Sequence, residues 1–167
     1  MARLELLLMR HGEAEDYADG GDALRALTER GQAMASRAGT MLQRCNLRPS
    51  HVVASPFLRA QQTAEGVLAT AGQGVSIAQE PRLVPASSAA LAVQALLDTA
   101  RTSGASRLLA VGHNPCITAM LGRLVGGPSS FAVSTGDLAH LSVDPADGAS
   151  VLLGYIPARV LEALFPA

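Results

Sequence analysis

A short apolar run near the start of the chain, Leu4–Met9, is the feature that most limits how this sequence can fold. The run ends abruptly at Arg10, His11 and Gly12. A nearly continuous apolar run with such a sharp end is typical of a strand that is buried on both faces. We therefore predict a buried strand that presents a cation and an imidazole at its carboxyl end, beside a glycine that leaves space for them.

The rest of the chain alternates between short apolar runs and longer segments with apolar residues at helical spacing. Further strands are predicted at 51–54, 75–78, 107–111, 140–143 and 151–156, and helices at 28–44, 57–70, 87–104, 116–125 and 157–164. Thr28 is expected to cap the first helix, and Ser87 or Ser88 the third. The alternation predicts an α/β fold, a three-layer αβα sandwich whose central sheet is mainly parallel with one antiparallel strand.

The length and composition of the chain fit one globular domain. It has 167 residues, of which 49% are hydrophobic and 16% charged, and it shows no linker or internal repeat. Its net charge of −1 argues against a nucleic-acid-binding protein. No stretch approaches the ~18 apolar residues of a membrane span, and Leu4–Met9 is too short for a signal peptide. Cys45 and Cys116 make no disulfide framework and fit a reducing, cytoplasmic setting.

Polar groups suited to phosphate follow three of the predicted strands. Arg10 and His11 follow the first strand. Ser55 follows the second, with Arg59 on the next helix, and His113 follows the fourth. The carboxyl ends of parallel strands share one edge of a sheet, so we expect these side chains to meet in one pocket. Arginine binds phosphate with a forked donor set, and histidine is a nucleophile near neutral pH, so the pattern indicates phosphoryl chemistry through a covalent histidine.

Three sequence blocks carry a specific resemblance. They are LMRHGEA at 8–14, SPFLRAQQTA at 55–64 and VGHNP at 111–115. Together, in this order and at this spacing, they resemble the histidine phosphatase superfamily, which has the phosphoglycerate mutase-like fold. The residues that also resemble its compact branch, the SixA-type phosphohistidine phosphatases, are Asp22, Arg25, Leu27, Thr28 and Gly31. The resemblance covers essentially the whole chain and implies one domain, 1–167, without an inserted helical lobe.

The resemblance implies a role for each residue of the expected pocket. His11 attacks phosphorus and becomes phosphohistidine, while Arg10 and Arg59 bind the phosphoryl oxygens. His113 also binds phosphate and stabilises the transferring group. We expect a hydrogen bond from the other ring nitrogen of His11 to a backbone oxygen, which would fix the tautomer. No metal or organic cofactor is expected, since arginines beside the two histidines would repel a metal cation.

Several other polar residues have competing interpretations. His51 and His140 lie outside the three blocks and are expected to be structural. Ser55 is expected to shape its loop and to cap the helix that follows it. Asn114 either orients His113, contacts phosphate or serves the turn. The acidic segment 13–22 either recruits a basic face of a partner or, as we expect, is a solvated loop.

Acids that could protonate a leaving group are scarce in this sequence. Glu80 is the nearest candidate and Glu13 the next, although a helix-end or loop charge is the simpler interpretation of Glu80. Phosphate esters need a placed acid because an alkoxide is a poor leaving group. An imidazole, with a pKa of about 6.5, takes up a proton more readily. We therefore expect a signalling phosphatase that acts on phosphohistidine in a protein of the histidine-phosphotransfer type.

Two other functions remain open on the sequence alone. The first is a broad phosphomonoesterase, which would cleave small phosphate esters such as sugar phosphates or nucleotides faster than phosphohistidine. The second is a non-catalytic phosphate-binding module. The complete set of Arg10, His11, Arg59 and His113 argues against the second, because binding alone needs no nucleophile. Neither nucleic acid nor membrane is an expected partner.

Overall fold

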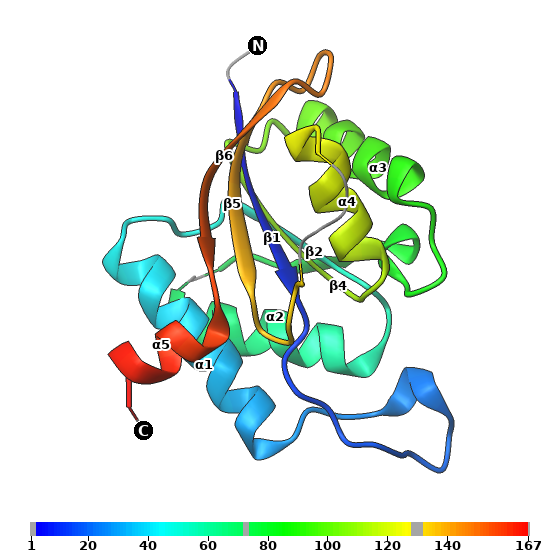
Figure 1. Cartoon of the computed structure of the whole chain (residues 1–167), viewed down its shortest axis with the longest axis vertical. Coiled ribbons are helices and arrows are strands. Elements are labelled where there is room, and N and C mark those ends of the chain that lie inside the picture. The colour runs from blue at the N-terminus through cyan, green and yellow to red at the C-terminus, as the bar shows by residue number, and fades with distance from the viewer. Residues whose placement is uncertain (1–2, 72–73, 128–131, 167) are drawn as a thin grey trace.

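The computed structural model in Figure 1 describes residues 3–71, 74–127 and 132–166. A six-stranded sheet lies at its centre, in the order β3-β2-β4-β1-β5-β6. The strands span Leu4–Arg10 (β1), His51–Ala54 (β2), Ile77–Gln79 (β3), Arg107–Gly112 (β4), Leu138–Val143 (β5) and Ser150–Ile156 (β6). Strands β1 to β4 are parallel, and β5 pairs antiparallel with both β1 and β6. The predicted sheet, mainly parallel with one antiparallel strand, is confirmed.

Helices cover both faces of the sheet, which gives three layers (Figure 1). One face carries α1 (Glu29–Arg44), α2 (Leu58–Ala71) and α5 (Ala158–Leu164), and the other carries α3 (Ala89–Ser103) and α4 (Cys116–Val125). Two short 3-10 turns, η1 (Asp22–Leu24) and η2 (Pro81–Leu83), lie in the connections. The predicted element bounds agree with the structure to within two residues. Ser88 directly precedes α3, although its side chain makes no capping hydrogen bond.

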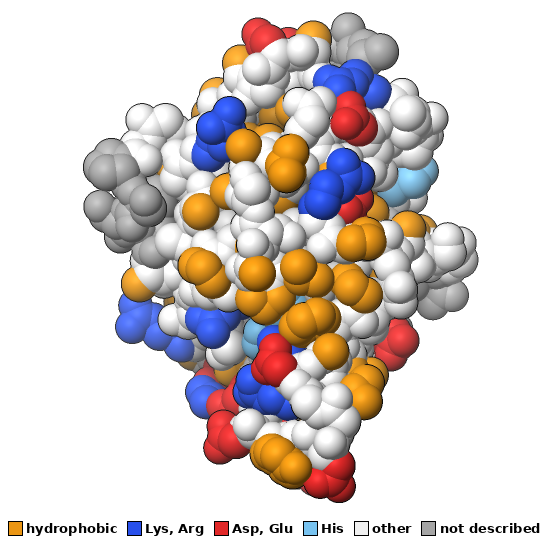
Figure 2. Space-filling model, turned by 90° about the vertical axis from the view of Figure 1, so that its right-hand side faces the viewer, with side chains coloured by type: hydrophobic (Ala, Val, Ile, Leu, Met, Phe, Trp, Pro, Cys, Tyr) orange, Lys and Arg blue, Asp and Glu red, His pale blue; other side chains and the backbone are white. Residues whose placement is uncertain are grey.

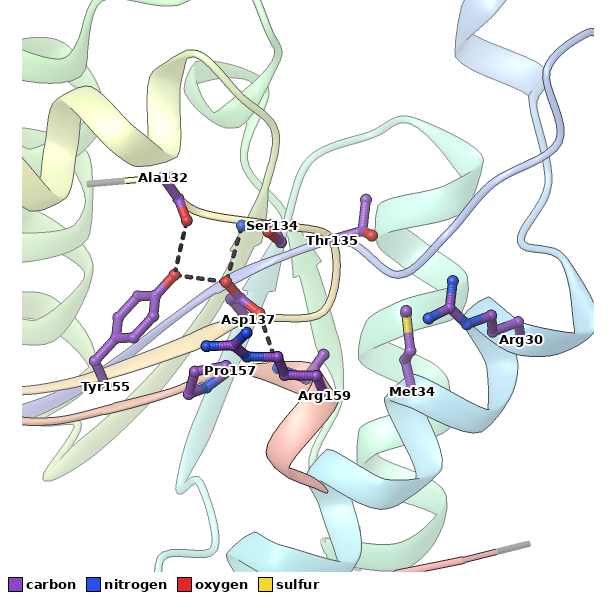
Figure 3. Close-up of a pocket in the computed structure, with 10 residues that line it drawn as sticks. Arg30, Met34, Ala132, Ser134, Thr135, Asp137, Tyr155, Pro157 and Arg159 are labelled. Carbon is purple, nitrogen blue, oxygen red and sulfur yellow. Dashed lines mark hydrogen bonds between the residues drawn. The ribbon is translucent and has the colours of Figure 1, made fainter. Parts of the chain in front are cut away.

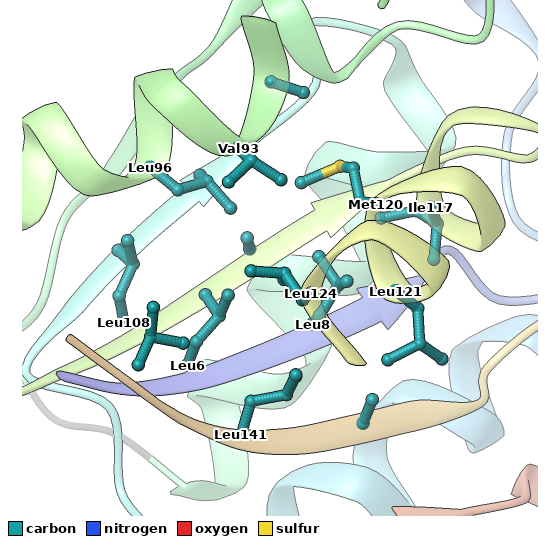
Figure 4. Close-up of a cluster of buried hydrophobic side chains, with 14 of the residues drawn as sticks. Leu6, Leu8, Val93, Leu96, Leu108, Ile117, Met120, Leu121, Leu124 and Leu141 are labelled. Carbon is teal, nitrogen blue, oxygen red and sulfur yellow. The ribbon is translucent and has the colours of Figure 1, made fainter. Parts of the chain in front are cut away.

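Side chains of β1 alternate between two hydrophobic clusters, as the pleat of a strand requires. Leu6 and Leu8 face α3 and α4, where they pack in the cluster drawn in Figure 4. Leu7 and Met9 face α1 and α2. Each of these four side chains is at most 1% exposed. Burial on both faces explains why the first strand is so nearly free of polar residues. None of the described helices is long and apolar enough to span a membrane.

The start of α1 packs directly against the chain that follows β1. Thr28 caps the helix as predicted, since its hydroxyl accepts a hydrogen bond from Gly31 N at 3.1 Å. A Cβ atom at Gly12 would lie 2.7 Å from Gly31 O, and one at Gly31 would lie 1.9 Å from Glu13 O. Only glycine fits at both positions, so the glycine after His11 serves the packing of a helix against this segment.

A crevice is expected where β1 and β4 end. The two strands are neighbours in the sheet, and the chain leaves β1 for α1 on one face and leaves β4 for α4 on the other. Ligands bind where neighbouring parallel strands send their connections to opposite faces. The register pairs Arg10 with Gly112, and His11 N donates to Gly112 O at 3.0 Å. The fold therefore delivers His11 and His113 to the same place.

Candidate active site

A cavity of about 360 Å³ opens at the carboxyl ends of these strands. All four residues that the sequence predicts to be catalytic line it, namely Arg10, His11, Arg59 and His113. The ring centroids of the two histidines are 4.8 Å apart. Side chains from β1, α2 and the end of β4 thus converge, although they lie far apart along the chain.

His11 is held as a neutral imidazole. Its Nδ1 lies 2.7 Å from Gly12 O, and because a carbonyl oxygen only accepts, Nδ1 carries the proton. This is the expected bond from the ring to a backbone oxygen. The Nε2 lone pair faces Arg59, whose Nε donates to it at 3.3 Å. Burial lowers the pKa of His11 to about 4, against the opposing effect of the Gly12 hydrogen bond, so the ring is unprotonated near neutral pH.

The guanidinium of Arg59 is fixed by Asp22 in η1. Its Nη1 donates to Asp22 O at 2.6 Å and its Nη2 to Asp22 Oδ2 at 3.0 Å. Arg25 donates to the second carboxylate oxygen at 2.9 Å, and this hydrogen bond holds the pKa of Asp22 below its usual range. Asp22 is exposed, as predicted for a solvated loop, but its contact with a cation of the cavity was not predicted.

Arg10 is anchored to a backbone carbonyl that the sequence could not reveal. Its Nη1 donates to Val133 O at 2.9 Å, and Asn114 Nδ2 donates to the same oxygen at 2.9 Å. Asn114 also accepts a hydrogen bond from Thr118, so it braces the Val133 carbonyl rather than the ring of His113. Arg10 Nε is buried and has no partner among the residues that the structure describes. A buried donor without a partner is rare in proteins, so this atom is a candidate for binding a polar ligand.

Hydrogen bonds to Asp137 hold the loop that carries Val133 in place, as Figure 3 shows. The carboxylate of Asp137 accepts hydrogen bonds from Ser134 N at 2.8 Å, Tyr155 OH at 2.6 Å and Ala158 N at 2.8 Å. Asp137 is only 4% exposed. A second pocket, of about 510 Å³, lies beside this network and shares Thr135 with the cavity. Asp137 was not predicted, because an aspartate before a strand has no motif of its own.

Among the described residues, His113 makes one side-chain hydrogen bond, to Ser55. Its Nε2 lies 2.8 Å from Ser55 Oγ, and Phe57 N donates to the same oxygen at 3.3 Å. The contact of Ser55 with its turn agrees with the predicted loop role, whereas its contact with His113 was not foreseen. Burial, together with the nearby His11 and Arg59, lowers the pKa of His113 to about 3. The ring is therefore neutral near pH 7 and has one N–H to donate.

Of the two candidate acids, Glu13 lies in the cavity lining and Glu80 lies outside it. The carboxylate of Glu13 is bound by Thr28 and Arg30 at 2.9 Å each. Glu80 is not among the lining residues, because both of its oxygens are held by Arg82 next to η2.

His51 and His140 do not line the cavity either, and they contact Ser50 and Glu5. Within 3–71, 74–127 and 132–166, no group of three His, Cys, Asp or Glu residues is placed to hold a metal ion.

Comparison with known proteins agrees with this geometry. A sequence profile of the histidine phosphatase superfamily (branch 1) matches residues 6–89. The chain belongs to the histidine phosphatase superfamily. Within this superfamily it is 28% identical to phosphohistidine phosphatase SixA of Escherichia coli (strain K12) over 141 residues, which cover 84% of this chain and 86% of SixA. It is also 36% identical over 115 residues to an uncharacterized protein of Picosynechococcus sp., with 67% of each chain covered.

The fold of this histidine phosphatase is also that of SixA. The structure of SixA complexed with tungstate matches with a TM-score of 0.87 and 25% identity, and the match covers 95% of this chain and 99% of that chain. The mixed six-stranded sheet with helices on both faces is therefore the phosphoglycerate mutase-like fold.

Proposed function

We propose that this histidine phosphatase, as a single domain over residues 1–167 without an inserted helical lobe, removes phosphate from phosphohistidine on a protein partner. The reaction passes through a covalent phosphohistidine at His11. The convergence of two neutral histidines and two arginines in one cavity carries the proposal. Its similarity to the phosphohistidine phosphatase SixA supports the substrate class.

Two displacements at phosphorus make up the proposed reaction. The Nε2 lone pair of His11 attacks phosphorus, and the bond from phosphorus to the substrate's ring nitrogen breaks, leaving its electron pair on that nitrogen. The substrate imidazole takes up a proton and departs. Water then attacks the phosphorus of phospho-His11 and loses a proton, while the bond from phosphorus to Nε2 breaks and leaves its electron pair on Nε2, which yields inorganic phosphate and neutral His11. Arg10 and Arg59 offset the negative charge that spreads over the transferring group.

The acids around the cavity support phosphohistidine over phosphate esters. Two carboxylates, Glu13 and Asp22, line the cavity, and each is bound by arginine. The hydrogen bond from Arg25 keeps the pKa of Asp22 low, so this acid is ionised near neutral pH. Glu80 is outside the lining, and Pro85, where the same segment reaches the cavity, has no proton to donate. An alkoxide leaving group would lack a proton donor here, whereas an imidazole depends on one much less.

The surface shown in Figure 2 supports a protein as substrate. Hydrophobic side chains gather across the middle of this face. Beside them a small area of histidine is exposed, and arginine and acidic side chains lie next to this area. Apolar surfaces with a polar rim are typical of protein contact sites. We propose a histidine-phosphotransfer protein of cytoplasmic signalling as the partner. The two unpaired cysteines support a reducing compartment.

A substrate panel tests this proposal. A phosphorylated histidine-phosphotransfer protein, sugar phosphates and nucleotides are each incubated with wild-type and His11→Ala protein, and the release of inorganic phosphate is measured. We expect the wild type to act fastest on phosphohistidine and to form an acid-labile phosphoenzyme that His11→Ala does not form. The matched control is His51→Ala, which keeps wild-type rates because His51 lies outside the cavity.

Each contrary result identifies a different function. Equal phosphate loss with wild-type and His11→Ala protein would rule out the covalent mechanism. Faster cleavage of small esters would identify a small-molecule phosphomonoesterase. Tight binding of a phosphopeptide without any phosphoenzyme would identify a phosphate-binding module.

A further inference from the structure

We propose that Ser55 is a positioning residue that fixes the tautomer of His113, so that the Nδ1–H group of this ring is the donor offered to the phosphoryl group. The inference rests on the proposed role of His113 in phosphoryl transfer. It adds a residue whose hydroxyl acts through another side chain and does not itself touch the substrate.

The hydrogen bonds around Ser55 determine which way its hydroxyl points. Ser55 directly follows β2 and is fully buried, at 0% exposure. Phe57 N donates to Ser55 Oγ at 3.3 Å, so one lone pair of the oxygen is already used. The other neighbour of the oxygen is His113 Nε2, at 2.8 Å. The oxygen keeps a second lone pair, but among the residues that the structure describes the hydroxyl proton has no acceptor other than this ring nitrogen, which makes Nε2 the unprotonated nitrogen of a neutral imidazole.

The tautomer follows from that bond, because the partner of one imidazole nitrogen decides where the single proton lies. With Nε2 accepting from Ser55, the proton of His113 lies on Nδ1. That nitrogen is buried and has no hydrogen-bond partner among the residues that the structure describes. His113 lines the cavity that also holds Arg10, His11 and Arg59. Nδ1 is therefore the one polar atom of the ring that remains for a ligand.

The chemistry of the ligand makes this tautomer the useful one. Phosphoryl oxygens accept hydrogen bonds, and a ring lone pair facing them would repel them. A buried N–H without a partner is unfavourable, so this donor is most stable when a ligand oxygen accepts its hydrogen bond. Without the Ser55 hydroxyl, nothing in the described surroundings of Nε2 would favour the Nδ1–H form of His113.

Nitrogen NMR on the wild-type protein tests the tautomer without reference to activity. In a ¹⁵N-labelled sample at pH 7, two-bond couplings of the imidazole distinguish Nδ1–H from Nε2–H. We expect Nδ1–H for His113 in the wild type and loss of that preference in Ser55→Ala. We also expect the His113 Nδ1–H resonance to shift when inorganic phosphate is added. An Nε2–H tautomer in the wild type would overturn the proposal.

The matched control is Ser50→Ala. Ser50 flanks β2 at its other end, and its hydroxyl donates to Arg107 O outside the cavity. This variant is expected to keep the wild-type tautomer of His113. A change in the tautomer with Ser50→Ala as well would mean that any disturbance of β2 is enough, which would also overturn the role of Ser55.

A kinetic cycle then separates positioning from a merely structural role. We expect Ser55→Ala to lower kcat at least about tenfold with a small change in KM, less than the roughly 10²–10³-fold loss that follows removal of a transition-state donor itself. Ser55→Thr keeps the hydroxyl and is expected to recover the rate. In a His113→Ala background, Ser55→Ala is expected to cost nothing further, since the two residues act as one unit.

The outcomes distinguish this inference from the proposed function. Persistence of the full Ser55→Ala loss in the His113→Ala background would show that Ser55 acts elsewhere and would overturn the inference. A wild-type protein that does not hydrolyse phosphohistidine would overturn the proposed substrate. In that case the tautomer and phosphate-titration measurements still decide the role of Ser55.

Discussion

The guanidinium of Arg59 links His11 to Asp22 of the acidic loop by three hydrogen bonds. Its Nε donates to His11 Nε2, and its two terminal nitrogens donate to Asp22. The side chain is therefore ordered before any phosphate arrives, although it is a long and flexible one. Its Nε must release the Nε2 lone pair of His11 before that lone pair can attack phosphorus, while the hydrogen bonds to Asp22 hold the guanidinium in place for the developing charge.

Arg59→Ala is expected to slow formation of the phosphoenzyme by about 10²–10³, because it removes this charge and its forked donors. Single-turnover measurement of phosphate transfer to His11 checks the size of the effect. Arg59→Lys is expected to recover little of it, since lysine lacks the fork. Arg82→Ala is the control, because Arg82 pairs with Glu80 outside the cavity. A near-normal rate for Arg59→Ala would remove the assignment.

At the scale of elements, the cavity depends on strand ends and on one loop. The strand ends bring in His11 and His113, while the segment 132–137 brings in the Val133 carbonyl that holds Arg10. Asp137 fixes this segment by accepting hydrogen bonds from its own loop, from β6 and from the start of α5. The antiparallel side of the sheet thus supports the site although it supplies none of the four predicted catalytic residues.

Asp137→Ala is expected to destabilise the fold by roughly 2–4 kcal/mol, because it leaves the buried Ala158 N–H without an acceptor and also removes the acceptor of the more exposed Ser134 N–H. Urea unfolding followed by circular dichroism measures this change. Tyr155→Phe removes a single hydroxyl from the same network, and its expected cost is about 1 kcal/mol. A loss for Asp137→Ala no larger than that for Tyr155→Phe would contradict the proposed bracing role.

The same elements show how far the sequence leads. The apolar run before Arg10 and the three blocks predict the strands, their shared edge and four of the residues that line the cavity, because the carboxyl ends of parallel strands lie at one edge of a sheet. The contacts of Asp22 with Arg59 and of Ser55 with His113 were not predicted, since each joins segments more than thirty residues apart. Val133 contributes only its carbonyl, and a backbone group leaves no signature in the identity of its side chain.

On the scale of the whole molecule, burying two neutral histidines affects how the fold responds to acid. The pKa of His11 is lowered to about 4 and that of His113 to about 3, whereas an unperturbed histidine titrates near 6.5. Between these values, the unfolded chain binds protons that the folded chain does not. The free energy of unfolding therefore falls as the pH is lowered through this range.

The expected loss of stability is at most about 1.4 kcal/mol per pH unit for each of the two histidines. Urea unfolding between pH 7.5 and pH 4.5 measures the slope. The double variant His11→Asn, His113→Asn is expected to lose stability more slowly on acidification, since it lacks both buried imidazoles. Equal slopes for the wild type and the double variant would contradict the proposed origin of the acid sensitivity.

The carboxylate of Asp22 on Arg59 also bears on how a catalytic cycle ends. Inorganic phosphate formed in the cavity would share Arg59, one of its two arginines, with the carboxylate of Asp22, so Arg59 keeps an anionic partner when phosphate leaves. Inorganic phosphate is accordingly expected to be a weak product inhibitor. Asp22→Asn is expected to lower its inhibition constant roughly twofold to fivefold, which corresponds to the energy of one exposed ion pair. Steady-state kinetics at several concentrations of inorganic phosphate measure this inhibition constant, and Asp19→Asn in the same loop is the control. An unchanged inhibition constant in Asp22→Asn would contradict the proposed role of Asp22. An enzyme that keeps a carboxylate within reach of its own phosphate site is arranged to let its product go.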